Sequence, residues 1–259
     1  EAGLENALLK QEFVLHYQPQ LDREGYIVGA EALLRWQPAG APLLLPEEFI
    51  PLAEETGLIV PVGAWVLRTA CNTLAEWAGK AERAGISRRH GLTLAINVSA
   101  RQFTDPDFVA EVETALAESG APPGQLRIEL TENQLLADIE GCIERMHTLR
   151  KLGVQFALDD FGTGCSSLSW LKRLPLDQLK IDQSFVGEVG ADPVDTAIVD
   201  SILGVARSLG LRTMAEGVET TAQHEFLSDR GCDGFQGHLF SRPVTREAFE
   251  RLSETERAT

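Results

Sequence analysis

Residues 13–36 read FVLHYQPQLDREGYIVGAEALLRW and contain two short apolar segments, 13–18 and 27–35. Short apolar runs that include β-branched residues are typical of β-strands. The connecting residues 19–26 are too few for a helix that would cross between parallel strands, but their number suits a hairpin. We therefore expect the first two strands of the fold to run antiparallel.

Six more strand-like segments follow, at 92–98, 126–131, 154–159, 178–182, 212–218 and 234–240. Amphipathic patterns with helical spacing lie between them, at 62–79, 107–119, 139–152, 194–209 and 221–230. Eight strands, mostly followed by helices, in about 250 residues predict an α/β protein with a TIM-like (β/α)8 barrel and an antiparallel strand near its start. An open doubly wound sheet is the alternative.

No long linker or low-complexity stretch divides the 259 residues, so we predict a single domain over residues 1–259. The sequence does not begin with methionine, and residues 1–10 have the pattern of a helix, which we expect to be the remnant of an upstream linker helix. No secretory signal and no run of about 18 apolar residues is present, so we expect no transmembrane segment.

The chain carries 23 basic and 39 acidic residues and a net charge of −16. Binding to DNA or RNA polymers requires many lysine and arginine contacts to phosphate, so this charge argues against a general nucleic-acid binder. The four cysteines, Cys71, Cys142, Cys165 and Cys232, are too far apart in sequence for a zinc hook or a redox pair. We interpret them as reduced thiols and expect a cytoplasmic protein.

Polar residues recur where the predicted strands end. They are Gln18, Glu31, Arg35, Asn97, Glu129, Glu132, Asp159, Asp160, Lys180, Asp182, Glu216, Glu219 and Gln236. The carboxyl ends of parallel barrel strands share one face, which is where barrel enzymes have their active sites. We therefore expect these side chains to gather at one site.

Carboxylates gathered in one cleft repel one another and stay ionised together only when cations lie among them. Oxygen ligands without histidine favour hard cations such as Mg²⁺ or Mn²⁺ over zinc. The adjacent pair Asp159 and Asp160 can face two metal ions, an arrangement that is common in phosphoester hydrolysis. Lys180, in this acidic set, would orient a hydroxide or offset phosphate charge.

Taken singly, several of these residues also have simpler interpretations. Asn97 suits a buried amide with satisfied hydrogen bonds, and Arg35 suits a surface pair with Trp36. Glu132 and Glu219 suit salt bridges. The functional interpretation depends on their shared position at strand ends.

Ordered motifs run along essentially the whole chain. They are YQPQ at 17–20, EALLR at 31–35, FIPLAEETGLI at 49–59, INVSARQF at 96–103, IELTEN at 128–133, DDFGTG at 159–164, LKIDQSF at 179–185, AEGVET at 215–220 and QGHLFSRP at 236–243. Together they resemble the EAL domain family, the cyclic di-GMP phosphodiesterases of bacteria. The resemblance implies a TIM-like barrel and a metal-dependent hydrolysis of cyclic di-GMP to linear pGpG.

The resemblance also implies roles for individual residues. Glu31, Asn97, Glu129 and Asp159 match the ligands of one metal ion. Asp160, Asp182 and Glu216 match the region of a second ion, with Asp159 shared. The expected cofactor is two ions of Mg²⁺ or Mn²⁺, and Ca²⁺ can fill such sites without necessarily supporting turnover.

The remaining matches concern water, substrate and support. Lys180 matches the lysine that holds the attacking water, and Glu216 the general base. Arg35 matches a phosphate contact, and Gln18 and Gln236 match groups near the nucleotide. Glu132 matches the glutamate that braces the loop 161–167, and Glu219 is expected to support the site from behind the metal ligands.

The chain departs from the family pattern at Cys165 and His238, where tyrosines are usual, and the segment after Trp36 is slightly short. None of these changes removes a metal ligand. The resemblance further implies a homodimer with contacts near the loop after the fifth strand. It also implies an upstream sensor or GGDEF-type domain, with this chain as the cytosolic module of a larger, membrane-anchored or soluble, signalling protein.

Two other functions remain open from the sequence. One is a catalytically inactive domain that binds cyclic di-GMP as a sensor, against which the intact metal-ligand set argues. The other is an unrelated metal-dependent barrel enzyme, such as an enolising enzyme that acts on carbonyl substrates.

Overall fold

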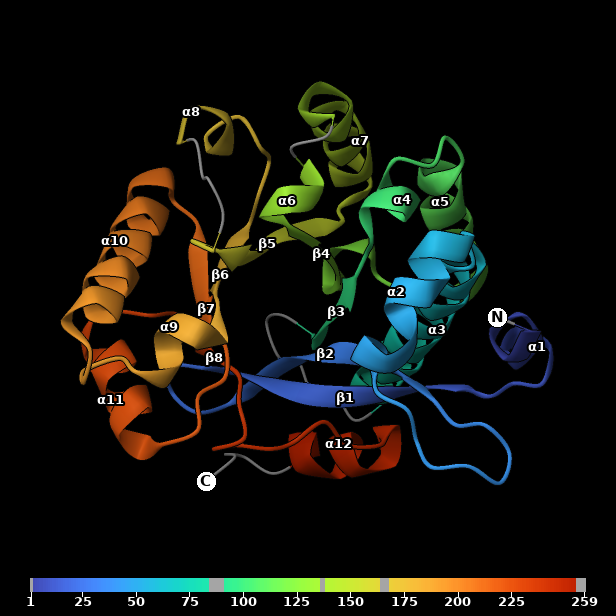
Figure 1. Ribbon diagram of the computed structural model, residues 1–259, viewed down its shortest axis with the longest axis horizontal. Helices are drawn as coiled ribbons and strands as arrows, with labels where there is room; N and C mark the ends of the chain where they lie inside the picture. The colour runs from blue at the N-terminus through green and yellow to red at the C-terminus, as the bar shows by residue number, and fades with distance from the viewer. Residues whose placement is uncertain (1, 84–90, 136–137, 164–167, 255–259) are drawn as a thin grey trace.

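The computed structural model describes residues 2–83, 91–135, 138–163 and 168–254 (Figure 1). Eight strands close into a barrel in sequence order. They are β1 (Phe13–Asp22), β2 (Ile27–Trp36), β3 (Thr93–Asn97), β4 (Leu126–Thr131), β5 (Gln155–Phe161), β6 (Gln178–Ile181), β7 (Arg212–Ala215) and β8 (Gly234–Phe235). Strand β1 is antiparallel to both β2 and β8, and the other neighbouring pairs are parallel. The predicted barrel with an early antiparallel strand is confirmed, and the open sheet is excluded.

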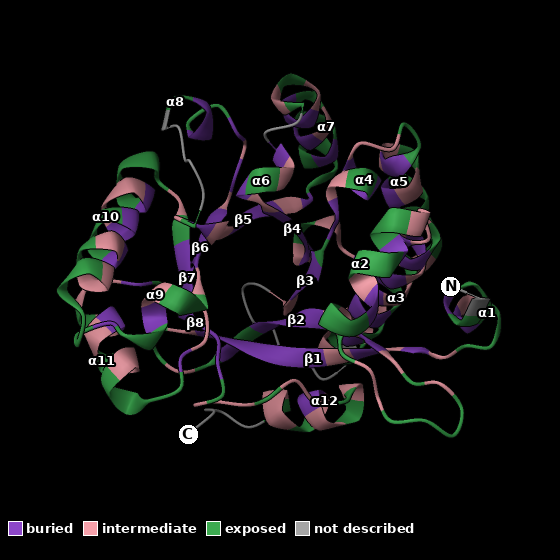
Figure 2. Cartoon of the chain, in the orientation of Figure 1, coloured by how far each residue is buried: buried purple, intermediate pink, exposed green. Residues whose placement is uncertain are grey.

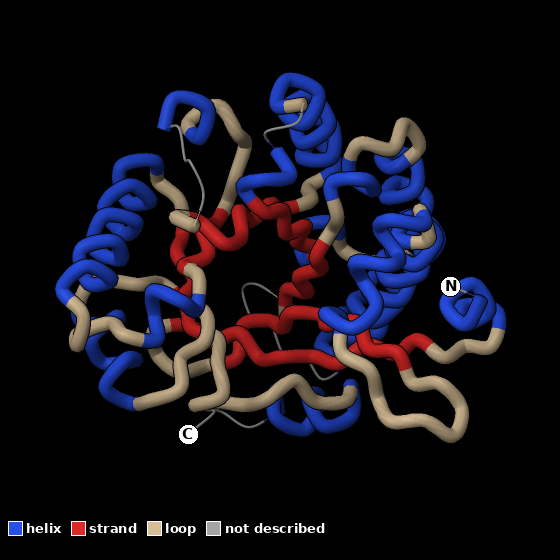
Figure 3. Tube along the Cα trace, viewed as in Figure 1, coloured by secondary structure: helices blue, strands red, loops and turns tan. Residues whose placement is uncertain are grey.

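Helices surround the ring of strands (Figure 3). The five predicted helices correspond to α3 (Ile59–Arg83), α5 (Phe108–Ser119), α7 (Ile139–Leu152), α10 (Pro193–Leu209) and α11 (Thr221–Asp229). The structure adds α1 (Ala2–Leu9), α2 (Pro46–Thr56), α12 (Arg246–Glu254) and the short helices α4 (Ala100–Phe103), α6 (Glu132–Leu135), α8 (Leu168–Leu171) and α9 (Gln183–Gly187), with a 3₁₀ turn at Pro123–Gln125. The short helices lie where strands give way to loops.

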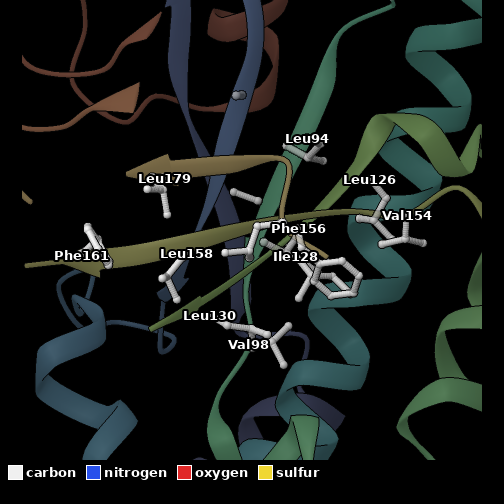
Figure 4. Packing of buried hydrophobic residues seen from close by; sticks show 14 of the residues in the cluster. Leu94, Val98, Leu126, Ile128, Leu130, Val154, Phe156, Leu158, Phe161 and Leu179 are labelled. Atoms are coloured by element: carbon white, nitrogen blue, oxygen red, sulfur yellow. The ribbon is translucent and has the colours of Figure 1, made fainter. Parts of the chain in front are cut away.

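Side chains alternate along the strands between an apolar outer face, which packs against the helices, and a more polar face inside the barrel. In β4, Leu126, Ile128 and Leu130 pack in the core between strands and helices (Figure 4), and the strands are buried while the outer helix faces are exposed (Figure 2). Successive side chains of a strand point to opposite faces, so Arg127 and Glu129 face the barrel interior. The interior therefore carries charged groups.

Hydrogen bonds join the strands at the end of the barrel away from the predicted site. The Arg127 guanidinium of β4 donates to Gln178 Oε1 of β6 at 2.9 Å and to Gln155 Oε1 of β5 at 2.7 Å. TIM-barrel interiors are usually filled by layers of bulky branched apolar residues. Here polar contacts replace part of that filling, and they fix three strands relative to one another beneath Lys180.

Helix α1 packs on the outside of the barrel. Leu4 and Ala7 are fully buried in an apolar cluster that includes Phe13 of β1 and Phe49 of α2, whereas Leu9 at the end of the same helix is 83% exposed. The first helix thus contributes apolar contacts to the domain.

We expect Leu4→Ala to lower the free energy of unfolding by about 2–5 kcal/mol, because it leaves a cavity in this cluster. Leu9→Ala is the matched control on the same helix and should change stability by less than about 0.5 kcal/mol, since the side chain is exposed. Urea unfolding of both variants measures the difference. Equal small effects would contradict the packing role of α1.

Candidate active site

A single ammonium group lies at the centre of the polar residues. Lys180 of β6 is completely buried, and its Nζ lies close to four carboxylate oxygens. The distances are 2.5 Å to Glu129 Oε2, 2.6 Å to Glu216 Oε1, 3.0 Å to Asp159 Oδ2 and 3.6 Å to Glu31 Oε2. The structure thus brings together carboxylates from the middle of β2, from β4 and β5, and from the residue after β7.

Burial and mutual charge shift the ionisation of these groups. Burial alone lowers the pKa of Lys180, but the surrounding carboxylates, Asp159 first, outweigh it and raise the pKa well above its ordinary value. Burial raises the pKa of Glu129 and of Glu216, against the opposing charge of Lys180. The uncompensated carboxylates therefore favour a proton or another cation in the cluster.

Two residues that the sequence placed at strand ends lie in the interior of their strands instead. Gln18 and Glu31 pair with each other in the middle of β1 and β2. Strand β1 continues past its predicted end at Gln18 to Asp22, whereas Glu31 is central both in the predicted segment 27–35 and in β2 as observed. Their side chains reach the site because the long hairpin crosses the barrel wall beside it. The strand-end prediction is wrong in detail for these two residues, although both line the same cavity.

Side-chain amides hold both oxygens of the Glu31 carboxylate. Asn97 Nδ2 donates to Glu31 Oε1 at 2.6 Å, and Gln236 Nε2 donates to Glu31 Oε2 at 2.6 Å. Gln236 Nε2 also donates to Gln18 Oε1 at 3.0 Å, and Gln18 Nε2 donates to the carbonyl oxygen of Ser241 at 3.2 Å. These bonds fix the orientation of Glu31 toward Lys180.

An irregularity in β5 directs two adjacent carboxylates to the site. The pairing of β5 with β6 shifts register between Leu158 and Phe161, and Asp160 has φ +52°. Aspartate tolerates this left-handed conformation better than most residues. Asp159, Asp160 and Glu216 each place one carboxylate oxygen within 4.8 Å of the others.

The second carboxylate of this pair is also perturbed. Burial, followed by the charges of Asp159 and Asp182, raises the pKa of Asp160 to about 6. Asp182 lies at the N-terminus of α9, where its Oδ1 accepts a hydrogen bond from the Ser184 backbone N–H at 3.0 Å.

Two cavities border the acidic centre. A polar cavity of about 210 Å³ is lined by Gln18, Glu31, Asp160, Asp182, Gln183, Glu216, Gly217, Glu219, Gln236, Gly237 and His238. A more apolar cavity of about 260 Å³ contains Leu33, Pro46 and Ile50 together with Asn97 and Glu129. The carboxylates therefore lie between the two cavities. This arrangement suits a ligand that reacts at its middle and has a bulky group on each side.

The polar cavity depends on a close backbone approach at Gly237. A Cβ added there would lie 2.1 Å from the carbonyl oxygen of Val218. His238 follows on the rim, with its Nδ1 3.7 Å from Glu219 Oε1. Glycine is therefore required directly after Gln236 for the chain to pass Val218 and form this wall.

The remaining predicted residues lie around this centre. Arg35 is buried near the end of β2 and donates to the Leu34 carbonyl oxygen at 2.8 Å, and Glu132 is buried at the start of α6. Cys165 and the end of the loop 161–167 lie outside the described residues. The sequence reasoning missed Gln20, which donates to Gln236 Oε1 at 3.0 Å; its two-residue spacing from Gln18 was the available signal.

The donor set fits divalent hard cations. Four carboxylates face one lysine, so the cluster keeps a net negative charge when ionised. Glu129 Oε1 is buried and has no hydrogen-bond partner within the described part of the chain, which leaves an acceptor atom open for a cation. Carboxylate and amide oxygens without histidine are ligands typical of Mg²⁺ and Mn²⁺.

Comparisons with known proteins agree with this geometry. The chain matches the EAL domain family over residues 1–243. It is 43% identical over 247 residues to the bifunctional diguanylate cyclase/cyclic di-GMP phosphodiesterase MucR of Pseudomonas aeruginosa, covering 94% of this chain and 35% of MucR. It is 39% identical over 251 residues to the cyclic di-GMP phosphodiesterase PdeR of Escherichia coli, covering 97% of this chain and 37% of PdeR.

Solved structures agree as well. The PaMucR phosphodiesterase in complex with c-di-GMP superposes with a TM-score of 0.89 at 42% identity, covering 96% of this chain and 98% of that one. The EAL enzyme Bd1971, bound to cAMP and cyclic di-GMP, superposes with a TM-score of 0.92 at 33% identity, covering 97% of this chain and 67% of that one.

The chain spans little more than a third of the length of MucR and PdeR. No helix in the described residues is long and apolar enough to cross a membrane. The family match nevertheless extends over nearly the whole barrel, including all the carboxylates around Lys180. The chain belongs to the EAL domain family.

Proposed function

We propose that this domain is a metal-dependent phosphodiesterase that hydrolyses cyclic di-GMP to linear pGpG. The observation that carries the proposal is the buried Lys180 ammonium among four carboxylates between two cavities. A cyclic dinucleotide has two bases, one on each side of its phosphates, and one base could lie in each of the two cavities. The names of MucR and PdeR support the same activity.

The proposed cofactor is a pair of Mg²⁺ or Mn²⁺ ions. Glu31, Asn97, Glu129 and Asp159 would hold one ion, and Asp160, Asp182 and Glu216 would hold the second together with Asp159. Bound divalent ions would offset the phosphate charge and lower the pKa of a bound water below its value in bulk water. Burial and the charges of Asp159 and Asp182 raise the pKa of Asp160 to about 6, and bound cations would offset this repulsion.

The side chains of the domain would position the reactants. Arg35 would contact a phosphate, and Gln18 and Gln236 would contact the nucleotide from the hairpin and from the end of β8. Lys180 would orient the attacking water by hydrogen bonding, and Glu216 would accept its proton. Attack in line on phosphorus breaks the bond to the 3′ oxygen, and the product is pGpG.

Hydrolysis is tested directly by incubating the protein with cyclic di-GMP and Mg²⁺ or Mn²⁺ and separating the nucleotides by chromatography. We expect pGpG to form, and Glu31→Ala to abolish its formation because the first ion loses a carboxylate ligand. Replacing the ions with Ca²⁺ should preserve binding and reduce turnover.

The same measurement distinguishes the alternative function. Tight binding of cyclic di-GMP by calorimetry, without product from the metal-loaded protein, would overturn the phosphodiesterase proposal and favour a catalytically inactive sensor. Absence of any binding would instead favour an unrelated barrel enzyme.

We expect Lys180→Met to reduce kcat by about a hundredfold or more, because the water would lose its positioning group. The variant also leaves four carboxylates without their buried counter-charge, so its metal-free form should unfold at lower urea concentration than the unsubstituted protein. Steady-state kinetics and urea unfolding check both effects.

Lys172→Met is the matched control, because Lys172 is an exposed lysine on the loop after α8. It should change neither kcat nor stability appreciably. A Lys180→Met enzyme with unchanged kcat would contradict the role given to Lys180.

We also propose that the domain forms a homodimer through an apolar hollow beside the end of β5. The hollow has a volume of about 310 Å³ and is lined by Phe161, Val194, Ala197, Ile198, Ser201, Ile202 and Val205. Val194, at the start of α10, is 65% exposed and adjoins the other apolar side chains of the hollow, so a partner could reach this face. A second copy would cover this face.

We expect Val194→Asp to shift the protein from dimer to monomer, because burying a new charge in the interface is unfavourable. Light scattering coupled to size-exclusion chromatography measures the mass. Val28→Asp is the control, since Val28 is an exposed valine of β2 outside the hollow. Equal masses for the unsubstituted protein and Val194→Asp would contradict this interface.

We propose a cytoplasmic location, which is supported by the free, buried thiols of Cys71, Cys142 and Cys232. An upstream sensor or GGDEF-type domain in the full-length protein stays a prediction.

A further inference from the structure

Gln20 is a completely buried amide in β1 with no part in the proposed hydrolysis. It follows Gln18 by two residues, so both side chains face the barrel interior. Its Nε2 donates to Gln236 Oε1 at 3.0 Å. Gln20 therefore contacts a residue of the site without lining the cavity where the substrate would bind.

The contact determines which end of the Gln236 amide faces Glu31. A carboxylate only accepts hydrogen bonds, so Gln236 must present its NH₂ group to Glu31 Oε2, as the 2.6 Å contact records. Its carbonyl oxygen then points away from Glu31 and requires a donor. Gln20 Nε2 is that donor.

Backbone hydrogen bonds fix the main chain of Gln236, so only its side-chain amide can rotate. The Gln236 N–H donates to the Ala215 carbonyl oxygen at 2.8 Å, and the Gln236 carbonyl oxygen accepts from the Val218 N–H at 3.1 Å. Without the Gln20 donor, among the described residues the contacts to Gln18 and Glu31 alone would hold the Gln236 amide. Rotation of the amide would turn its oxygen toward the Glu31 carboxylate, and the two acceptors would repel each other.

The buried amide of Gln20 is also incompletely satisfied. Its Oε1 has no hydrogen-bond partner among the residues that the structure describes. Burying an acceptor without a partner is unfavourable, and an apolar side chain of similar length would avoid it. The position therefore favours orientation of Gln236 over stability.

We propose that Gln20 is a positioning residue that acts through Gln236 to hold Glu31 in the orientation that binds metal. The proposal rests on the proposed metal-dependent function, because it assigns Glu31 as a metal ligand. Partners that orient metal ligands typically contribute about 10- to 100-fold to metal affinity or activity. Gln20→Met removes the donor while keeping a side chain of similar length.

The test measures Mn²⁺ binding by titration calorimetry, with no substrate present. We expect Gln20→Met to weaken Mn²⁺ binding by about tenfold and to lower kcat more than it changes KM. In a Gln236→Met background, adding Gln20→Met should change the Mn²⁺ Kd by less than about twofold, because Gln20 acts only through Gln236. Gln20→Leu, which also lacks the donor, replaces Gln20→Met if that variant does not fold.

Gln178→Met is the control for a general loosening of the barrel interior, because it also removes a buried glutamine amide that bonds between strands. Gln178 accepts from Arg127 and has no recorded contact with Gln236. The control should bind Mn²⁺ within about twofold of the unsubstituted protein. Equal weakening by Gln178→Met and Gln20→Met would overturn the proposal, because the loss would then reflect a loosened interior.

Two other results separate this inference from the proposed function. An unsubstituted protein that binds Mn²⁺, with unchanged binding in Gln20→Met, overturns the role of Gln20 alone. Additive effects of Gln20→Met and Gln236→Met overturn it as well. An unsubstituted protein that binds no Mn²⁺ overturns both proposals.

Discussion

The site depends on one buried positive charge. The Lys180 side chain is fully buried, and its ammonium faces carboxylates from four separate segments of the chain. A charge in such a position is tolerated only when its partners are held in place. Barrel closure, the amide contacts to Glu31 and the irregular turn at Asp160 all serve to hold them. The carboxylates outnumber the lysine, so the cluster has a net negative charge when all of them are ionised. That charge favours the binding of further cations.

The polar interior explains why this barrel differs from one filled by apolar layers. Arg127, Gln155 and Gln178 form hydrogen bonds across three strands below Lys180. Gln18 and Gln20 of β1 and Gln236, which follows β8, form another set beside it. The apolar core lies instead between the strands and the helices, where Leu126, Phe156 and their neighbours pack (Figure 4). Stability and chemistry are thus carried by opposite faces of the same strands.

Features set by local sequence periodicity were predictable, whereas those that depend on contacts between distant residues were not. The periods of 2 and 3.6 residues identified all eight strands and five of the longer helices, and the short 19–26 connection predicted the antiparallel hairpin. The extent of β1 was not predictable, because this strand continues past Gln18 through Pro19, Gln20 and Asp22, which are not typical strand residues. Gln20 was missed because its role arises from contact with Gln236, far away in sequence.

The antiparallel first strand has a consequence for how the protein is made. Strand β1 closes the barrel against β8, Tyr17 exchanges backbone hydrogen bonds with Val244, and Phe249 of α12 stacks near Tyr17. Gln18 and Gln236 are 218 positions apart. At synthesis rates of about 5–20 residues per second, roughly 10 to 40 seconds pass between them on the ribosome. A nascent chain therefore cannot form the contacts of Gln18 and Glu31 with Gln236 early, and a C-terminally truncated chain would expose an unpaired edge of β1 to aggregation.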